Sequence, residues 1–304
     1  MAGGSARVVY AALAGNTLIA VAKFAAFGLS GSSAMLTEAI HSLVDSTDQL
    51  LLLLGQARGG RPPSATHPFG YGMETYFWSF IVALMVFLLG GVASVFQGVR
   101  HLLAPEPLTA PGIGLGVLAI AAVFETASFV VGFKEFKRVV RGRKVGLWSF
   151  IRTSKDPSLY ATLLEDSAAL IGIAIAAAGI VASSVFHLLW ADGAASIAIG
   201  LLLAAVAAVL ANETRSLIAG EAVAAPVMEE LNKVLAADER IIELVEVATL
   251  HLGPQAVLVA LTLTFRSDMT LADLREAMAE LTQALQKADG RVCHVYIRPA
   301  SSLE

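Results

Sequence analysis

Cysteine and charge are both scarce in this chain of 304 residues. It has one cysteine, Cys293, which excludes an internal disulfide framework and a cysteine-rich metal cluster. Charged residues make up 15% of the sequence, whereas an ordinary soluble domain has about 25%. The formal net charge is −4 and no basic stripe lies outside the predicted loops, so nothing indicates a nucleic-acid partner. Nucleophile-elbow and HExxH motifs are also missing, and we expect no enzymatic activity.

Hydrophobic residues, in contrast, make up 56% of the chain and dominate it up to about residue 211. A membrane-spanning helix needs about 20 mostly apolar residues. Six segments meet this condition: residues 8–29, 33–55, 76–99, 112–133, 160–185 and 194–210. We expect the first to be a retained span, because no small-residue cleavage site follows it. The sequence therefore predicts an α-helical membrane protein, with a six-helix transmembrane domain at 1–211 and a soluble domain at 212–304.

Basic residues are concentrated in the connections between the second and third helices and between the fourth and fifth. These residues are Arg58, Arg61, Lys134, Lys137, Arg138, Arg141, Arg143, Lys144, Arg152 and Lys155. The alternate connections carry little besides Arg100. Because basic loops stay on the cytoplasmic side, we expect a multi-pass protein of the cell (inner) membrane with both termini in the cytoplasm.

Beyond residue 213 the pattern becomes that of a soluble α/β domain. Residues 226–235 and 271–286 have helical periodicity, whereas 244–251, 256–265 and 292–297 are typical of strands. Gly253-Pro254 predicts a hairpin turn between the first two strands. The order predicts a small sheet with its helices on one face.

Several ionisable side chains interrupt the predicted spans, and each is a functional candidate because a charge inside a membrane is costly. They are Lys23 in the first helix, Glu38, His41, Asp45 and Asp48 in the second, Glu125 in the fourth, and Glu165 and Asp166 in the fifth. Alternatively, these groups form hydrogen bonds and ion pairs that fix the helix packing.

The spacing of His41 and Asp45 places both on one helix face, one turn apart. Imidazole together with carboxylate suits a divalent cation such as Zn²⁺, with Mn²⁺ also possible where oxygen ligands prevail. The fifth helix offers Asp166, with Thr162 one turn earlier as a poor ligand. Glu165, a water or an oxygen from another helix would complete a tetrahedral site.

The remaining ionisable groups have more than one interpretation. We expect Lys23 to neutralise an acid on a neighbouring helix. Glu38 is either a partly solvated residue near the helix start or a ligand. Asp48 and Glu125 either support the ligands or relay protons, or they form structural pairs.

Three motifs carry a resemblance to a known family. Residues 30–49, SGSSAMLTEAIHSLVDSTDQ, resemble the second helix of the cation diffusion facilitator family, and 67–72, HPFGYG, resemble its HxFGxG loop. Residues 154–172, SKDPSLYATLLEDSAALIG, are similar to the fifth helix of the zinc transporter nine-like branch. In this family's pattern His41, Asp45 and Asp166 match transport-site positions, and Thr162 stands where most members have histidine.

The resemblance implies a homodimeric metal/proton antiporter in the lipid bilayer, with a cytoplasmic, metallochaperone-like (ferredoxin-like) C-terminal domain. It implies Zn²⁺ as transported substrate and no prosthetic group. Because metal ligands must be deprotonated, a proton gradient can eject the ion by alternating access. His41 is the natural proton carrier, with an unperturbed imidazole pKa of about 6.5. The alternatives are export of Mn²⁺, Fe²⁺ or Co²⁺/Ni²⁺, or a non-transporting membrane metal sensor or scaffold.

Overall fold

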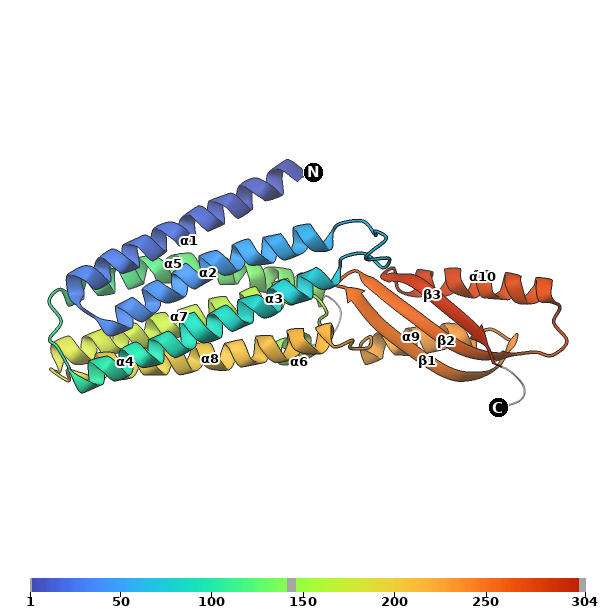
Figure 1. Cartoon of the computed structure of the whole chain (residues 1–304). Helices are drawn as coiled ribbons and strands as arrows, with labels where there is room; N and C mark the ends of the chain where they lie inside the picture. The colour runs from blue at the N-terminus through green and yellow to red at the C-terminus, as the bar shows by residue number, and fades with distance from the viewer. Residues whose placement is uncertain (1, 141–145, 301–304) are drawn as a thin grey trace. The chain divides into compact units, whose positions relative to one another are not determined.

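The computed structural model describes residues 2–140 and 146–300 of the chain (Figure 1). The chain divides into two compact units, Met1–Gly55 with Trp78–Thr214 and Gln56–Phe77 with Arg215–Glu304. We call the first the helical unit and the second the α/β unit. The division groups the connection 56–77 with the C-terminal residues, which the sequence did not indicate. The domain boundary expected after residue 211 stays a prediction.

Long helices make up the helical unit. In chain order they are α1 (Ala2–Ser30), α2 (Ser33–Gly59), α3 (Met73–Met85), the π-helical segment η1 (Val86–Val92), α4 (Ala93–Leu103), α5 (Pro111–Val139), α6 (Leu147–Thr153), α7 (Pro157–Val185) and α8 (Trp190–Ile218). α3, η1 and α4 form one continuous helix of 31 residues, Met73–Leu103. Short α6 lies in a connection where no helix was expected, next to Arg141, Arg143 and Lys144, which are outside the described residues.

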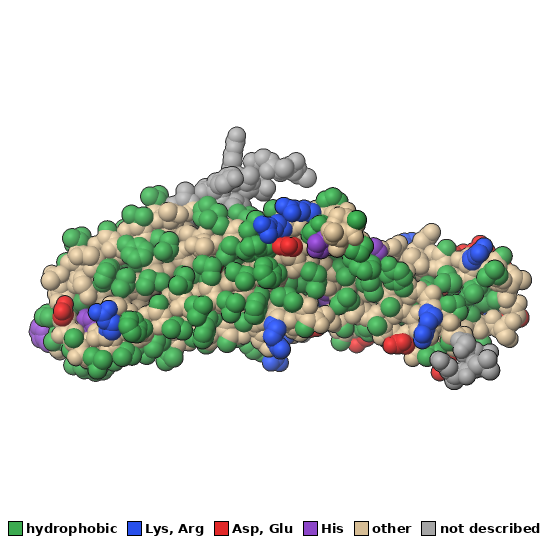
Figure 2. Space-filling model, viewed as in Figure 1, with side chains coloured by type: hydrophobic (Ala, Val, Ile, Leu, Met, Phe, Trp, Pro, Cys, Tyr) green, Lys and Arg blue, Asp and Glu red, His purple; other side chains and the backbone are tan. Residues whose placement is uncertain are grey.

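Within the described residues, four helices are long and apolar enough to cross a membrane. They are Met73–Leu103, Pro111–Val139, Pro157–Val185 and Trp190–Ile218. Large apolar side chains are exposed on them, such as Phe87, Leu88 and Phe124, and hydrophobic side chains cover much of the visible surface of this unit (Figure 2). Such a surface suits lipid and not water.

The first two predicted spans are helices, but their membrane crossing stays a prediction. The described apolar part of α1, Gly15–Ser30, is short. α2 is lowered in hydropathy by Glu38, His41, Asp45 and Asp48, the same side chains that make it a functional candidate. Length and composition therefore support four of the six spans directly.

Small residues bring α8 close to its neighbours. A Cβ atom on Gly179 of α7 would lie 2.5 Å from the Cβ of Ala195 of α8. A Cβ on Gly98 of α4 would lie 2.6 Å from the carbonyl oxygen of Gly193 of α8. Any larger side chain at these glycines would force the helices apart, so backbone contact between helices depends on them.

The α/β unit has the predicted order α-β-β-α-β. Its elements are α9 (Ala225–Ala236), β1 (Ile241–Gly253), β2 (Ala256–Phe265), α10 (Leu271–Ala288) and β3 (Val292–Pro299). The strand order is β1-β2-β3, with β1 antiparallel and β3 parallel to β2. The hairpin turn follows Gly253 as predicted.

One face of this sheet forms the core of the unit. Val257, Val259 and Leu261 alternate along β2 and are buried, with 3% exposure or less. They share one hydrophobic cluster with Leu231 of α9 and Leu281 of α10. Because side chains two residues apart on a strand point to the same side, both helices cover the same face, as the sequence predicts.

Candidate metal transport site

The α2 helix places His41 and Asp45 in contact. The Nδ1 atom of His41 lies 3.3 Å from Oδ1 of Asp45, and the two side chains are 1% and 15% exposed. Residues four apart on a helix are neighbours on its surface, so the local sequence alone determines this pair. Nε2 of His41 has no hydrogen-bond partner in the described part of the chain. A neutral imidazole could therefore offer that nitrogen to a cation.

The α7 helix carries the other two carboxylates of the predicted ligand set. Asp166 accepts a hydrogen bond of 2.9 Å from the hydroxyl of Ser128 on α5. Glu165 is buried, and its Oε1 atom has no hydrogen-bond partner among the residues described. The Thr162 hydroxyl donates to the carbonyl oxygen of Ser158 at 3.0 Å, which leaves its oxygen lone pairs as its possible contribution to a cation.

Electrostatic interactions connect these groups across three helices. The Asp45 carboxylate interacts with those of Glu125, Glu165 and Asp48, and Glu165 interacts with Asp166. Side chains of α2, α5 and α7 thus share one polar interior. Even so, among the described residues no three His, Cys, Asp or Glu side chains are close enough together to hold a metal ion. Of the predicted ligands, His41 and Asp45 are in direct contact. Thr162, Glu165 and Asp166 stay predicted ligands.

Asp48 adds an acid one turn beyond Asp45 on α2. Its side chain is fully buried. Neither of its carboxylate oxygens has a hydrogen-bond partner within the described residues. A buried acid without such partners is costly in a membrane helix, so the structural-pair interpretation of Asp48 gains no support from hydrogen bonds.

Lys23 and Glu38 form a buried ion pair between α1 and α2. The Nζ atom of Lys23 lies 2.8 Å from Oε2 of Glu38, and both side chains are fully buried. The same ammonium donates to the Ser42 hydroxyl at 2.8 Å. The expectation that Lys23 neutralises an acid on a neighbouring helix is confirmed. The interpretation of Glu38 as a partly solvated end residue is wrong, because Lys23 supplies the partner that its burial requires.

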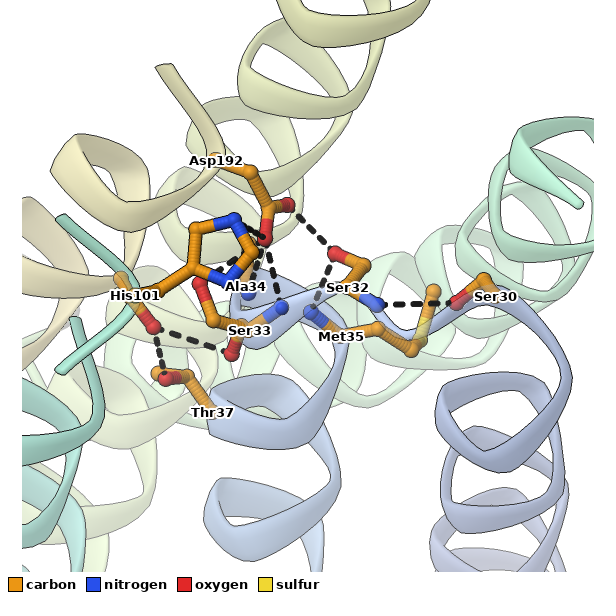
Figure 3. Close-up of polar contacts among 9 residues, drawn as sticks. Ser30, Ser32, Ser33, Ala34, Met35, Thr37, His101 and Asp192 are labelled. Atoms are coloured by element: carbon orange, nitrogen blue, oxygen red, sulfur yellow. Dashed lines mark hydrogen bonds and ion pairs between the residues drawn. The ribbon is translucent and has the colours of Figure 1, made fainter. Parts of the chain in front are cut away.

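A second polar cluster surrounds Asp192 in the first turn of α8 (Figure 3). Its carboxylate accepts hydrogen bonds from the hydroxyl groups of Ser32 and Ser33 and from the backbone N–H groups of Ser33 and Ala34. Nε2 of His101, near the end of α4, lies 3.8 Å from it. A carboxylate from α8 thus caps the N-terminus of α2, where the helix has unpaired N–H groups and a partial positive charge.

The sequence prediction missed the Asp192 cluster because the sixth helix was expected to begin at residue 194. The structure begins α8 at Trp190, which places Asp192 inside the helix. Asp192 could have been found by the criterion applied to the other spans, which is an ionisable residue within or next to a long apolar run.

The loop between α2 and α3 is organised by its own side chains. His67 stacks on Tyr71 with ring centroids 4.2 Å apart. Its Nδ1 atom lies 3.1 Å from the Thr66 hydroxyl, and its N–H bonds to Ser64. Through these contacts His67 holds the loop together.

The fold and the buried ionisable groups define a polytopic membrane protein with a polar interior suited to cations. Residues 9–219 match the model of the cation efflux transmembrane domain. The chain therefore belongs to the cation efflux family, which confirms the resemblance to cation diffusion facilitators.

Relatives of known name support the expected branch. The chain is 32% identical over 250 residues to the mitochondrial proton-coupled zinc antiporter SLC30A9 of Homo sapiens, which covers 82% of this chain and 44% of the relative. It is 32% identical over 269 residues to metal tolerance protein C4 of Arabidopsis thaliana, covering 88% and 58%. The cation-efflux pump FieF of Cronobacter sakazakii is 31% identical over 140 residues, 46% of each chain. The chain spans about half the length of these relatives.

Proposed function

We propose that this protein exports divalent metal ions across a membrane in exchange for protons, with Zn²⁺ as the main substrate. The observation that carries the proposal is the buried contact between His41 and Asp45 on α2. An imidazole next to a carboxylate in an apolar helix bundle is a site for a borderline divalent cation. The SLC30A9 relatives are named proton-coupled zinc antiporters, which agrees with this chemistry.

Asp166 and Glu165 of α7 complete the proposed ligand set, with Thr162 as a weaker oxygen donor. Without a cation, neighbouring carboxylates such as Asp45 and Glu165 repel one another. A divalent ion would remove that repulsion and draw the side chains of α2 and α7 together. The ion is carried and not chemically changed, so the activity is transport and not enzymatic catalysis.

Proton exchange follows from the chemistry of the ligands. Imidazole and carboxylate bind metal in their deprotonated forms, so each binding event releases protons. In the proposed cycle metal enters from one side, the helices expose the site to the other side, and protons replace the ion there. His41 is the proposed main carrier of these protons.

Thr162 supports a second candidate substrate. A histidine at this position would add a second imidazole, whereas a threonine leaves the α7 side with oxygen ligands alone. Oxygen ligands suit Mn²⁺ better than nitrogen ligands do. Export of Mn²⁺ is therefore the runner-up, and Fe²⁺, Co²⁺ or Ni²⁺ would follow it.

We further propose that the protein is a homodimer in the cell membrane with both termini in the cytoplasm. The basic residues Arg58, Arg61 and Lys134 support this orientation. They lie at or near the C-terminal ends of α2 and α5, which would be on the same side of the membrane. α1 and α2 would provide the two additional spans. The α/β unit would then face the cytoplasm.

The test is metal flux in proteoliposomes that contain the purified protein. Wild-type protein should move Zn²⁺ when a proton gradient is imposed, with protons moving in the opposite direction. Asp45→Asn should abolish the flux, because it removes a charged ligand. Glu230→Gln is the matched control, since it also neutralises one acid but lies on the exposed surface of α9.

Two outcomes would contradict the proposal. Metal movement without counter-movement of protons would reject antiport. Flux that is absent from wild-type liposomes, although the protein is folded and binds Zn²⁺, would favour the metal sensor or scaffold.

A further inference from the structure

A lysine lies inside the polar interior that we assign to a cation. Lys23 of α1 is fully buried, and its ammonium bonds to Glu38 and Ser42, both at 2.8 Å. Glu38 and Ser42 are four residues apart on α2, as are His41 and Asp45. The resident ammonium is therefore bound within one helical turn of the proposed metal ligands.

The charge of Lys23 acts on the groups around it. It interacts electrostatically with His41 and Asp45 on α2 and with Glu125 on α5. A fixed positive charge near these side chains opposes any cation that they bind, and this effect is strong where water is excluded. Lys23 must therefore influence how tightly the site holds its substrate.

Lys23 also determines where the Glu38 carboxylate lies. Oε2 of Glu38 is held by the ammonium, while Oε1 lies against α7, 2.6 Å from where a Cβ on Gly172 would be. Oε1 has no hydrogen-bond partner within the part of the chain that is described. Glu38 lies on the His41 face of α2, one turn before it. Without Lys23, both Glu38 oxygens would be available to a cation in the same interior.

We propose that Lys23 is a specificity-determining residue of the transport site. It keeps Glu38 out of the ligand set and offsets one negative charge, so that the site releases its ion and disfavours cations that prefer carboxylate oxygens. This inference depends on the proposed metal transport function. It concerns affinity and ion preference, which can be measured without transport.

Three variants of the purified protein test this proposal, and the two single variants should change metal affinity in opposite directions. Lys23→Met should tighten Mn²⁺ binding about tenfold or more, and more than Zn²⁺ binding, because it frees a hard oxygen ligand and removes a repelling charge. Glu38→Gln should weaken binding of both ions about tenfold, because it leaves the ammonium unpaired. The double variant has the wild-type net charge, and its affinities should return to within about threefold of wild type.

Dissociation constants for Zn²⁺ and Mn²⁺ would be measured by calorimetric titration in detergent, with thermal unfolding recorded for each variant. A structural role alone would lower the stability of both single variants and leave the preference for Zn²⁺ over Mn²⁺ unchanged. That result would overturn the proposal. So would a double variant that binds metal as Lys23→Met does. The double variant buries no unpaired charge, so it remains informative if a single variant fails to fold.

The failure of this inference differs from the failure of the transport function. If the wild-type protein binds neither ion, the assigned site is wrong. It is also wrong if the Asp45→Asn variant binds both ions as tightly as the wild-type protein does. If Asp45→Asn loses binding but the Lys23 and Glu38 variants bind as wild type does, the site stands and Lys23 does not determine its specificity.

Discussion

Charged side chains are treated differently in the two units of the chain. In the α/β unit, acids and bases meet as hydrogen-bonded pairs, such as Arg291 with Asp289 and Arg266 with Asp268, each at 2.6 Å. In the helical unit, Asp48 and Glu165 are buried with carboxylate oxygens that have no hydrogen-bond partner among the described residues. One unit pairs its charges locally, and the other holds several acids in a shared interior.

The charges of the two units therefore have different roles: those of the α/β unit contribute a little to stability, and those of the helical unit are candidates for function. Exposed ion pairs contribute about 0–1 kcal/mol each, and the α/β unit depends mainly on its apolar core. A charge inside a membrane helix costs about 3 kcal/mol or more. Under the proposed function, a cation substrate would balance the charge of these acids, of which Lys23 offsets only part.

The same substitution, Asp to Asn, should lower flux in the helical unit and stability in the α/β unit. Asp166→Asn should lower metal flux about 100-fold or more, because an amide replaces a charged ligand. Asp289→Asn should change flux less than about twofold and should instead weaken the α/β unit, because it removes a partner of Arg291. Flux in proteoliposomes and thermal unfolding would be measured for both.

Equal flux in Asp166→Asn and wild-type protein would remove α7 from the ligand set. Loss of flux in Asp289→Asn without loss of stability would show that the two units do not divide function and stability in this way.

Two helix N-termini offer a second comparison. The N-terminus of α10 is capped locally, by Thr270 and Asp273 in a reciprocal capping box. The N-terminus of α2 is capped by Asp192, which is more than 150 residues away in the chain. A local cap holds one helix, whereas the distant cap also ties α8 to α2.

Asp192→Asn should therefore destabilise the protein more than Thr270→Ala, by about 2 kcal/mol against about 1 kcal/mol. The charged acceptor of several hydrogen bonds is lost in the first case and one neutral cap in the second. Thermal unfolding in detergent measures both. A larger loss for Thr270→Ala would indicate that the Asp192 cluster contributes little to holding α2.

The sequence predicted local features well and long-range ones poorly. The strand 256–265 and the contact between His41 and Asp45 follow from periodicity, which neighbouring residues determine. The bond from Ser128 to Asp166 joins residues 38 apart and has no sequence signature. The π-helical segment Val86–Val92 was also missed, because its apolar residues fit an α-helix equally well.

Helix ends were predicted less accurately than helix positions. The start of α7 has a local signature, because Pro157 occupies its first turn and the Asp156 side chain accepts a hydrogen bond from the Ser158 N–H at 3.1 Å. The start of α8 was placed at residue 194 instead of Trp190, because Asp192 interrupts the apolar run before that residue. This acid accepts its hydrogen bonds from Ser32, Ser33 and Ala34, at the start of α2.

Thr162 tests whether α7 determines ion preference. Thr162→His should shift the ratio of Zn²⁺ to Mn²⁺ transport about tenfold toward Zn²⁺, because a second imidazole favours the borderline ion. Ser167→His, on the same helix with a hydroxyl that also bonds to the backbone, is the matched control. Competition between the two ions in proteoliposomes gives the ratio. An unchanged order in Thr162→His, or an equal shift in the control, would count against Thr162 as a site residue.

The smallest expected effect is a pH dependence that belongs to the α/β unit. Hydrogen bonds from the Arg240 side chain hold the pKa of Asp238 below its ordinary value of 3.8. A carboxylate whose folded pKa is depressed stabilises the folded state above its unfolded pKa and loses that contribution as pH falls through the folded value. Protection of the Arg240 amide, which bonds to Asp238 at 3.0 Å, should therefore fall on acidification below about pH 4. The effect should stay below about 1 kcal/mol, because the pair is solvent-accessible. Hydrogen exchange of the full-length protein, corrected for intrinsic rates, measures it, and Asp238→Asn should lack the extra loss. The same acid-dependent loss in Asp238→Asn would assign it to another group.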